Sequence, residues 1–503
     1  MRTLGALATV TATLCAALPG SGSVEAQGAD SATVAPRAFP AALSVSHDVA
    51  RFGRTELVGL LGTRYLVSFV EGWAFGPGVY GGITGSRGGF FAIGGEVAGR
   101  RSVAREVSIV GALFGGGSGG GSARVGSGLF LRLYAGVRWH LDAVEVDVGA
   151  SHIDIGHSVV SSTQASLGLS VPLTFRVVPR DRLGVPVGAT GRSGIGFDDV
   201  ESFVMSYHPI GASTRISGGA LAAFISLVGV RAERALTLNA GIALEGLGAA
   251  SGGAAGYAEY LVSGWWRTAL WHDRASVGLR VGAGMGGGGD VPVAGGLLLK
   301  GAGTGRLRLT DALELRVEGG FVRAPGERFE ALTASAGLAF AVDGAATDSQ
   351  AAYPVRTEWL IGMEAHDAVR IDGSRGAIAN VALRANRFVT PLFYVSGQTR
   401  YSLYGGVGGY GAGLVGAGVE SPIATWRCGA ELLVGAAGGG GLSVGGGAIV
   451  QGLAYIVREI GAGFAVRGGV GGVRSLEGTV SATVADLSLG YLFGVTRGRR
   501  ARS

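Results

Sequence analysis

A glycine-rich hairpin that occurs three times places the strongest constraint on how this chain can fold. Stretches rich in glycine lie at residues 115–121, 286–289 and 438–441, and each follows one apolar run and precedes another. Their spacing gives a repeat of roughly 150–170 residues, and such a period has to be recognised before other features are interpreted. The chain is therefore expected to build one structural unit three times.

The composition excludes several classes of protein. Glycine supplies 96 of the 503 residues, but no Gly-X-Y period is present, which excludes collagen. Hydrophobic residues make up 47% of the chain and the mean hydropathy is +0.39, too apolar for a disordered glycine-rich chain. The one dense basic run, residues 497–502, is interpreted as a frayed tail, so no nucleic-acid partner is expected.

The first 26 residues are typical of a secretory signal peptide. Arg2 precedes an apolar segment at residues 4–18, and small residues lie around Ala26, where cleavage is expected. The apolar segment is too short for a spanning helix. Cleavage leaves Cys428 as the one cysteine, so the exported chain is not a disulfide scaffold.

Composition shifts divide the chain into repeats and linkers. We predict a signal peptide at 1–26, a disordered leader at 27–38, β repeats at 39–178, 200–342 and 354–493, linkers at 179–199 and 343–353, and a basic tail at 494–503. Each repeat holds about eight strands, recognised by alternating or continuous apolar runs between turn residues. The copies match at several points, including His47-Asp48 with His366-Asp367, and Tyr80-Gly81-Gly82 with Ser251-Gly252-Gly253 and Tyr404-Gly405-Gly406.

The alternation also has a direction. Residues 144–148 read Val-Glu-Val-Asp-Val, which places valines on one face of a strand and carboxylates on the other. Backbone groups in lipid must all be paired, which helices or closed barrels achieve, and no convincing amphipathic helix is found. The pattern predicts an all-β fold of up-and-down antiparallel transmembrane β-barrels.

The mature chain resembles bacterial outer-membrane β-barrel proteins. The resemblance rests on the export signal, the alternating strands and the last strand, Leu489-Gly490-Tyr491-Leu492-Phe493. It implies location in the bacterial outer membrane, with membrane lipid and the barrel-assembly machinery as partners and self-association as a further option. Proteins of this class usually end on the terminal aromatic residue, whereas residues 494–503 follow Phe493 here.

Two architectures fit the repeats. One is three tandem eight-stranded barrels joined by the linkers, and the other is a single barrel of about 24 strands. The difference matters because narrow barrels are filled by side chains, whereas barrels beyond about 16 strands hold a channel or a plug.

The glycine stretches have two interpretations. One is a flexible hairpin tip, and the other is a smooth face against which another barrel or subunit packs closely. The candidate packing glycines are Gly115, Gly116, Gly117, Gly286, Gly287, Gly288, Gly438, Gly439 and Gly440.

No catalytic, cofactor-binding or metal-binding constellation is recognised in the sequence. Charged residues in strand patterns are instead expected to face a barrel lumen, where they would either pair and fill it or line a pore. These candidate lumen charges are Glu145, Asp147, Glu314, Arg316, Glu318, Arg458 and Arg467.

The main functional expectation is a non-enzymatic structural or assembly role in the outer membrane. The alternative is a pore or transporter for small solutes, which requires the single large barrel. A lipid hydrolase and a secreted coat protein are lesser alternatives, the first without a recognisable site.

Overall fold

The computed structural model describes residues 35–141, 144–156, 160–187, 194, 196–211, 214–270, 274–327, 329–342 and 353–496. The expected signal peptide, most of the leader, much of both linkers and most of the basic tail lie outside these residues. No helix in the described part is long and apolar enough to cross a membrane.

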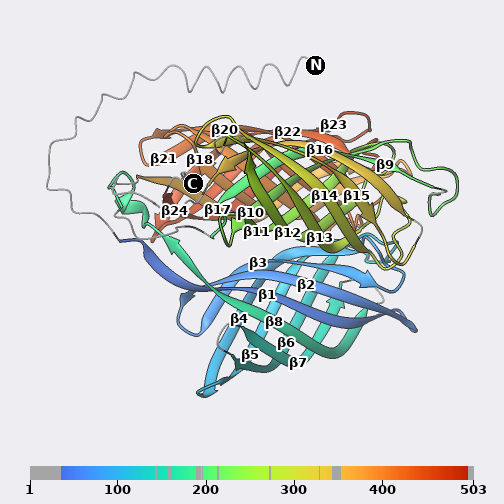
Figure 1. Cartoon of the computed structure of the whole chain (residues 1–503), viewed down its shortest axis with the longest axis horizontal. Coiled ribbons are helices and arrows are strands. Elements are labelled where there is room, and N and C mark those ends of the chain that lie inside the picture. Colours follow the sequence, from blue (N-terminus) through green and yellow to red (C-terminus); the bar gives the residue numbers. More distant parts are fainter. Residues whose placement is uncertain are drawn as a thin grey trace.

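The strands form three closed barrels of eight strands, each in chain order (Figure 1). Barrel 1 contains β1 (Arg37–Phe52), β2 (Glu56–Val70), β3 (Trp73–Thr84), β4 (Phe91–Ala104), β5 (Val107–Gly119), β6 (Leu129–His140), β7 (Glu145–Ile155) and β8 (Ser161–Val177). After the short 3-10 helix η1 (Arg180–Arg182), barrel 2 contains β9 (Asp199–Pro209), β10 (Ile225–Ala235), β11 (Ala240–Ser251), β12 (Ala258–Leu270), β13 (Ala275–Gly287), β14 (Leu297–Arg308), β15 (Leu313–Arg323) and β16 (Glu330–Ala341). Barrel 3 contains β17 (Pro354–Val369), β18 (Arg375–Phe388), β19 (Phe393–Tyr404), β20 (Gly411–Ile423), β21 (Trp426–Gly438), β22 (Ala448–Gly461), β23 (Phe464–Ser475) and β24 (Ser481–Thr496).

Each barrel closes on its own first strand. β1 pairs with β8, β9 with β16 and β17 with β24, all antiparallel. Closure leaves no edge strand with unpaired backbone groups, which is the condition for a sheet surrounded by lipid. The alternative of one barrel of about 24 strands is therefore wrong, because the wall closes after every eighth strand.

The outward faces of the strands are apolar and the inward faces polar. In β24, Leu487 and Leu489 are 63% and 45% exposed, whereas Asp486 and Ser488 between and beside them are buried. The alternation predicted for residues 144–148 is also present, with Glu145 and Asp147 buried and Val148 exposed. Leucine outside and carboxylate inside is the reverse of a water-soluble barrel and is the pattern of one embedded in lipid.

The hairpins show which residues are equivalent among the repeats. The N–H groups of Gly82, Ala249 and Ser402 donate to the carbonyl oxygens of Phe90, Tyr257 and Tyr410, so the turns after β3, β11 and β19 have equal length. This pairing aligns Gly85, not Gly81, with Gly252 and Gly405. The predicted match of Tyr80-Gly81-Gly82 with the other two copies is therefore displaced by four residues.

Candidate functional site

The interior of each barrel is filled by ion pairs. In barrel 1, the guanidinium of Arg132 donates to both carboxylate oxygens of Asp48 at 3.1 and 3.2 Å, and Ser151 donates to the same carboxylate at 2.6 Å. Arg138 lies between Glu145 and Asp147, at 2.8 and 2.7 Å. Buried charges of opposite sign with additional hydrogen bonds satisfy one another, which a charge left alone could not achieve.

Barrel 2 holds the densest cluster of charges. Arg231 is fully buried and lies 2.8 Å from Glu201, 3.2 Å from Glu245 and 2.7 Å from Glu318. Arg280 also lies 2.9 Å from Glu318. These contacts cross from wall to wall, so the cluster blocks the lumen.

Barrel 3 repeats the arrangement with different residues. Arg400 lies 2.5 Å from Glu364, and Arg467 lies 2.7 Å from Glu431. Gln451 donates to Glu364 as well, at 2.8 Å. All five side chains are buried.

The structure separates Arg458 from the other candidate lumen charges. Glu145, Asp147, Glu314, Arg316, Glu318 and Arg467 are buried within barrels 1, 2 and 3. Arg458 instead lies exposed on the outer face of β22, 5.0 Å from the ring of Trp426. Its neighbours Tyr455 and Val457 occupy the inward positions, and the period of two places Arg458 on the opposite face. Arg458 is therefore not a lumen residue.

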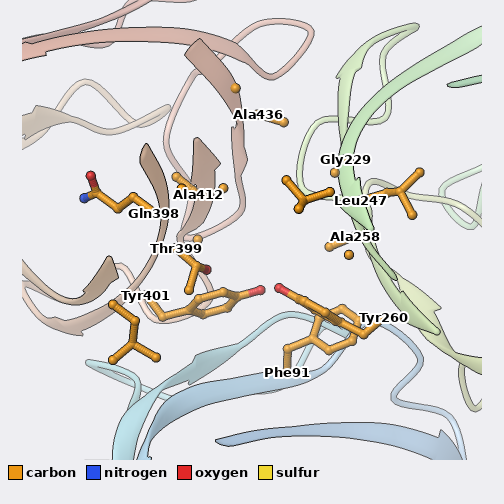
Figure 2. A pocket seen from close by; sticks show the side chains of 18 of the residues that line it. Phe91, Gly229, Leu247, Ala258, Tyr260, Gln398, Thr399, Tyr401, Ala412 and Ala436 are labelled. Carbon is orange, nitrogen blue, oxygen red and sulfur yellow. The ribbon is translucent and has the colours of Figure 1, made fainter. Parts of the chain in front are cut away.

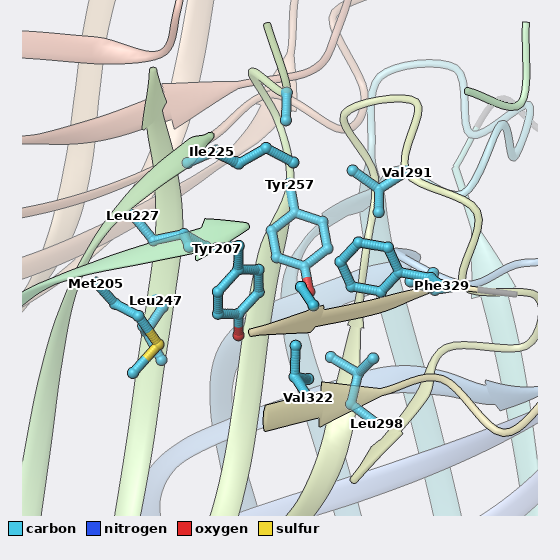
Figure 3. Packing of buried hydrophobic residues seen from close by; sticks show 14 of the residues in the cluster. Met205, Tyr207, Ile225, Leu227, Leu247, Tyr257, Val291, Leu298, Val322 and Phe329 are labelled. Atoms are coloured by element: carbon cyan, nitrogen blue, oxygen red, sulfur yellow. The ribbon is translucent and has the colours of Figure 1, made fainter. Parts of the chain in front are cut away.

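Apolar clusters close one end of every lumen, beyond the ion pairs. In barrel 2, Tyr207, Tyr257, Phe329 and Val291 belong to one buried cluster (Figure 3). Val293 belongs to the same cluster. The two valines come from the turn between β13 and β14, which folds inward over the barrel end. Equivalent turns supply buried valines to the matching clusters of the other barrels, Val125 in barrel 1 and Val444 in barrel 3.

Glycine backbones join the three barrels at this same end. We call the contact residues the glycine ring: Gly89, Gly119, Gly256, Gly287, Gly409 and Gly438. A Cβ atom on Gly287 would lie 2.5 Å from the Gly89 nitrogen, one on Gly438 would lie 2.0 Å from the Gly256 nitrogen, and one on Gly119 would lie 2.1 Å from the Gly409 nitrogen. In each contact, a glycine in a short turn of one barrel meets the glycine that ends a strand of another barrel. The three contacts join barrel 1 to barrel 2, barrel 2 to barrel 3, and barrel 3 to barrel 1.

The candidate packing glycines divide between this interface and the barrel walls. Gly287 and Gly438 belong to the glycine ring, and a Cβ on Gly117 would lie 2.6 Å from the carbonyl oxygen of Ser402 in barrel 3. The nearest atoms to Gly115, Gly116, Gly286, Gly288, Gly439 and Gly440 belong to their own barrels. The interface partners Gly89, Gly256 and Gly409 were missed by the sequence reasoning because they lie in the short turns before β4, β12 and β20, outside the long glycine stretches.

The outer walls of the barrels enclose a central cavity of about 2540 Å³. Aliphatic side chains from every barrel line it, among them Leu43, Val171, Val204, Leu244, Ile361 and Leu489. These residues alternate with the inward ones on their strands, so the cavity lies between the barrels and outside all three lumens. A volume of this size exceeds the roughly 300–1,000 Å³ of ordinary small-molecule pockets.

Aromatic residues narrow the cavity near the glycine ring. The hydroxyl groups of Tyr260 in barrel 2 and Tyr401 in barrel 3 face each other (Figure 2). Phe91 of barrel 1 packs edge-on against Tyr260, with ring centroids 5.2 Å apart. We call these three residues the aromatic constriction.

No metal centre is recognised among the described residues, where no group of three or more His, Cys, Asp or Glu side chains could hold an ion. Cys428 is a free, partly buried strand residue.

No protein-family model matches the chain, and no curated protein matches it. Solved structures similar to it include Pseudomonas aeruginosa OccK2 (OpdF) in complex with glucuronate, at 10% identity, with 91% of this chain and 97% of that chain covered and a TM-score of 0.23. Acinetobacter baumannii OccAB3 is 12% identical, with 91% of this chain and 99% of that chain covered and a TM-score of 0.21. The outer membrane protein opdK from Pseudomonas aeruginosa is 8% identical, with 91% of this chain and 98% of that chain covered and a TM-score of 0.20.

These neighbours correct the main functional expectation. A structural or assembly role is wrong as the first interpretation, since OccK2 was solved with a small solute bound, in line with the alternative of a pore or transporter. TM-scores near 0.2 carry no argument about the solute or its path, which have to come from this chain's own geometry. Three closed barrels, with aliphatic outer faces and ion-paired interiors, make the chain a β-barrel protein of the bacterial outer membrane.

Proposed function

We propose that the protein is a non-enzymatic transporter of small apolar solutes, and that its path is the central cavity between the barrels. The observation that carries this proposal is the cavity of about 2540 Å³, which is lined by the outer walls of all three barrels. This proposal keeps the pore or transporter function that the sequence offered as the alternative. It replaces the single large barrel of that alternative with a path between three small barrels.

The lumens are poor candidates for the path. A solute in barrel 2 would have to displace Arg231 from its three carboxylate partners and then pass the apolar cluster around Tyr257. Breaking a buried ion pair by removing one partner costs about 3–5 kcal/mol. Passage through such a lumen would require several of these contacts to open together.

The lining of the cavity selects the class of solute. A polar molecule that enters it would lose its hydration without gaining hydrogen bonds, because the surrounding side chains are mostly aliphatic. An apolar solute gains roughly 25 cal/mol for each Å² removed from water. The cavity therefore favours hydrocarbon-like solutes over sugars and ions.

The turns suggest how the path is oriented. The turns on the side of the chain termini are short, such as those between β2 and β3 and between β22 and β23, whereas those at the glycine ring are longer. Outer-membrane barrels have short periplasmic turns and longer extracellular loops. In this proposal the termini face the periplasm, and the aromatic constriction lies toward the cell exterior.

Two glycines allow the path to be blocked without disturbing a barrel. Gly397 and Gly413 line the cavity, and a Cβ at either position would meet no atom within 4 Å. Gly301 of β14 has equally open surroundings but does not line the cavity, so Gly301→Trp is the matched control.

The test measures how fast N-phenyl-1-naphthylamine, an apolar dye, crosses the outer membrane of Gram-negative cells that produce the protein. The outer leaflet slows this dye, so a protein path raises the rate of fluorescence increase. We expect the wild type and Gly301→Trp to raise this rate, and Gly397→Trp and Gly413→Trp to remove the effect. Equal rates in cells with and without the protein, or an unimpaired Gly413→Trp variant, would refute the proposal.

A further inference from the structure

We infer that the central cavity takes an acyl chain that carries an anionic head group, and that Arg234 binds the head group. This inference rests on the proposed function, since it identifies the solute of the same cavity. It starts from an arginine that the ion-pair networks leave out.

Arg234 lies at the mouth of the cavity. It is the last residue but one of β10, next to a short turn at the end where the chain termini lie. Its neighbours Arg231 and Glu233 are buried in the lumen, whereas Arg234 is half-buried and is among the residues that line the cavity. Its guanidinium lies against Gly196, another lining residue, where a Cβ would be 2.9 Å from Nη1.

The side chain of Arg234 has no hydrogen-bond or ion-pair partner within the described parts of the chain. The nearby carboxylate of Asp198 accepts the backbone N–H of Ala235 at 2.6 Å. A half-buried guanidinium at the edge of an apolar space is costly unless an anion completes its hydrogen bonds. Its planar fork suits a carboxylate or a phosphate.

The third barrel supplies a comparison for Arg234. Arg387 occupies the equivalent place in β18. Both strands have a register shift, near Ser226 in β10 and near Ala379 in β18, and Arg234 and Arg387 follow these shifts by the same number of residues. Its guanidinium donates to Thr357 Oγ1 at 2.7 Å and to the carbonyl oxygen of Val342 at 2.9 Å. The chain thus provides partners for an outward arginine at this level in barrel 3, and in the described part of barrel 2 it leaves the arginine facing the cavity.

The shape of the cavity matches an extended hydrocarbon chain. Along β11 the lining runs from Ile242, near Arg234, to Ala250, near the glycine ring. That stretch corresponds to about 25 Å of strand at ~3.3 Å per residue. Half of a hydrocarbon core about 30 Å thick is shorter than this, so a lipid-length chain fits. Between these ends the lining is mostly apolar, and a head group finds its cation at Arg234.

The experiment is native mass spectrometry of the full chain in a neutral detergent, titrated with three twelve-carbon compounds: dodecanoate, dodecyl phosphate and the uncharged dodecanol. The wild type should retain all three, and the two anions should bind more tightly than the alcohol. Whether the carboxylate or the phosphate binds better identifies the kind of head group. Heat-modifiable migration on gels confirms that each variant is folded.

Three variants separate the head-group site from the cavity itself. Arg234→Gln should weaken anion binding by about tenfold or more and leave dodecanol unchanged, because a charge-assisted hydrogen bond is lost and the apolar contacts stay. Arg234→Lys should retain part of the preference for anions. Arg375→Gln, which removes an exposed arginine of β18 outside the cavity, should change nothing.

The outcomes distinguish the two proposals. If Arg234→Gln binds dodecanoate and dodecyl phosphate as the wild type does, the head-group inference is refuted while the transport path stands. If the wild type binds none of the three compounds, or if Gly413→Trp binds them undiminished, the cavity is not the binding site and the proposed function fails with it.

Discussion

The backbone N–H of Gly409 donates to the carbonyl oxygen of Ser118 at 2.9 Å, which joins the third barrel to the first. Gly88 makes a similar bond to Ala294 at 2.8 Å, which joins the first barrel to the second. Contacts that run head to tail close into a ring when the rotation fits. Three repeats close here within a single chain, and the closed ring of barrels encloses the cavity.

The glycine ring should not tolerate a side chain. Gly438→Val should lower the free energy of unfolding by about 1–3 kcal/mol, because its Cβ would lie 2.0 Å from the Gly256 nitrogen and the two barrels would have to separate. The matched control is Gly468→Val in β23, where a Cβ meets no atom within 4 Å. Urea titration followed by heat-modifiable migration measures the difference. Equal midpoints for both variants would show that the barrels do not depend on this contact.

The ion pair between Arg132 and Asp48 should show the asymmetry of a buried charge. Arg132→Leu should lower the free energy of unfolding by about 3–5 kcal/mol, since Asp48 remains buried without its cation. Arg132→Leu combined with Asp48→Leu should recover most of the loss. The same urea titration is applied to Arg132→Leu, Asp48→Leu and the double variant. If the loss of unfolding free energy in the double variant equals the sum of the losses in the two single variants, this account is contradicted.

The all-β class and the inward carboxylates follow from period-two patterns in the sequence, and the three repeats follow from the recurring glycine stretches. The register between repeats does not. The sequence match aligned Asp48 of the first repeat with Asp367 of the third. In the structure, Asp48 pairs with Arg132 in barrel 1, and the residue at the same level of barrel 3 is Glu364, which pairs with Arg400. Asp367 is instead exposed near Arg375. Glycine-rich repeats hide shifts of this kind because many alignments match equally well.

The cavity could not be found from the sequence for a different physical reason. Leu489 lines the cavity and Leu487, two residues earlier on the same outward face of β24, does not, yet both are aliphatic. A wall that faces lipid and a wall that faces another barrel have the same composition, so the pattern of one strand cannot tell them apart. The long glycine stretches indicated a site of close packing. The short turns that they contact, before β4, β12 and β20, have too few glycines to be recognised as the other side of that interface.

Single-channel recordings should show no large conductance. The lumens are filled by pairs such as Arg231 with Glu201, and the central cavity is too apolar to carry hydrated ions. The measurement is ion current across planar bilayers that contain the purified wild-type protein, with a large open barrel as the positive control. Regular steps comparable to that control would contradict a closed lumen.

The aromatic constriction should limit the rate of transport. Replacing Tyr260 and Tyr401 together by alanine removes the two rings that face each other at the narrow end of the cavity, while Phe91 and the glycine ring stay in place. Dye should then cross cells that produce the double variant several times faster than cells with the wild type. Tyr404→Ala is the control, because this exposed tyrosine is near the same end but does not line the cavity. A slower or unchanged rate in a folded double variant would mean that solutes leave the cavity sideways between barrels, without passing the constriction.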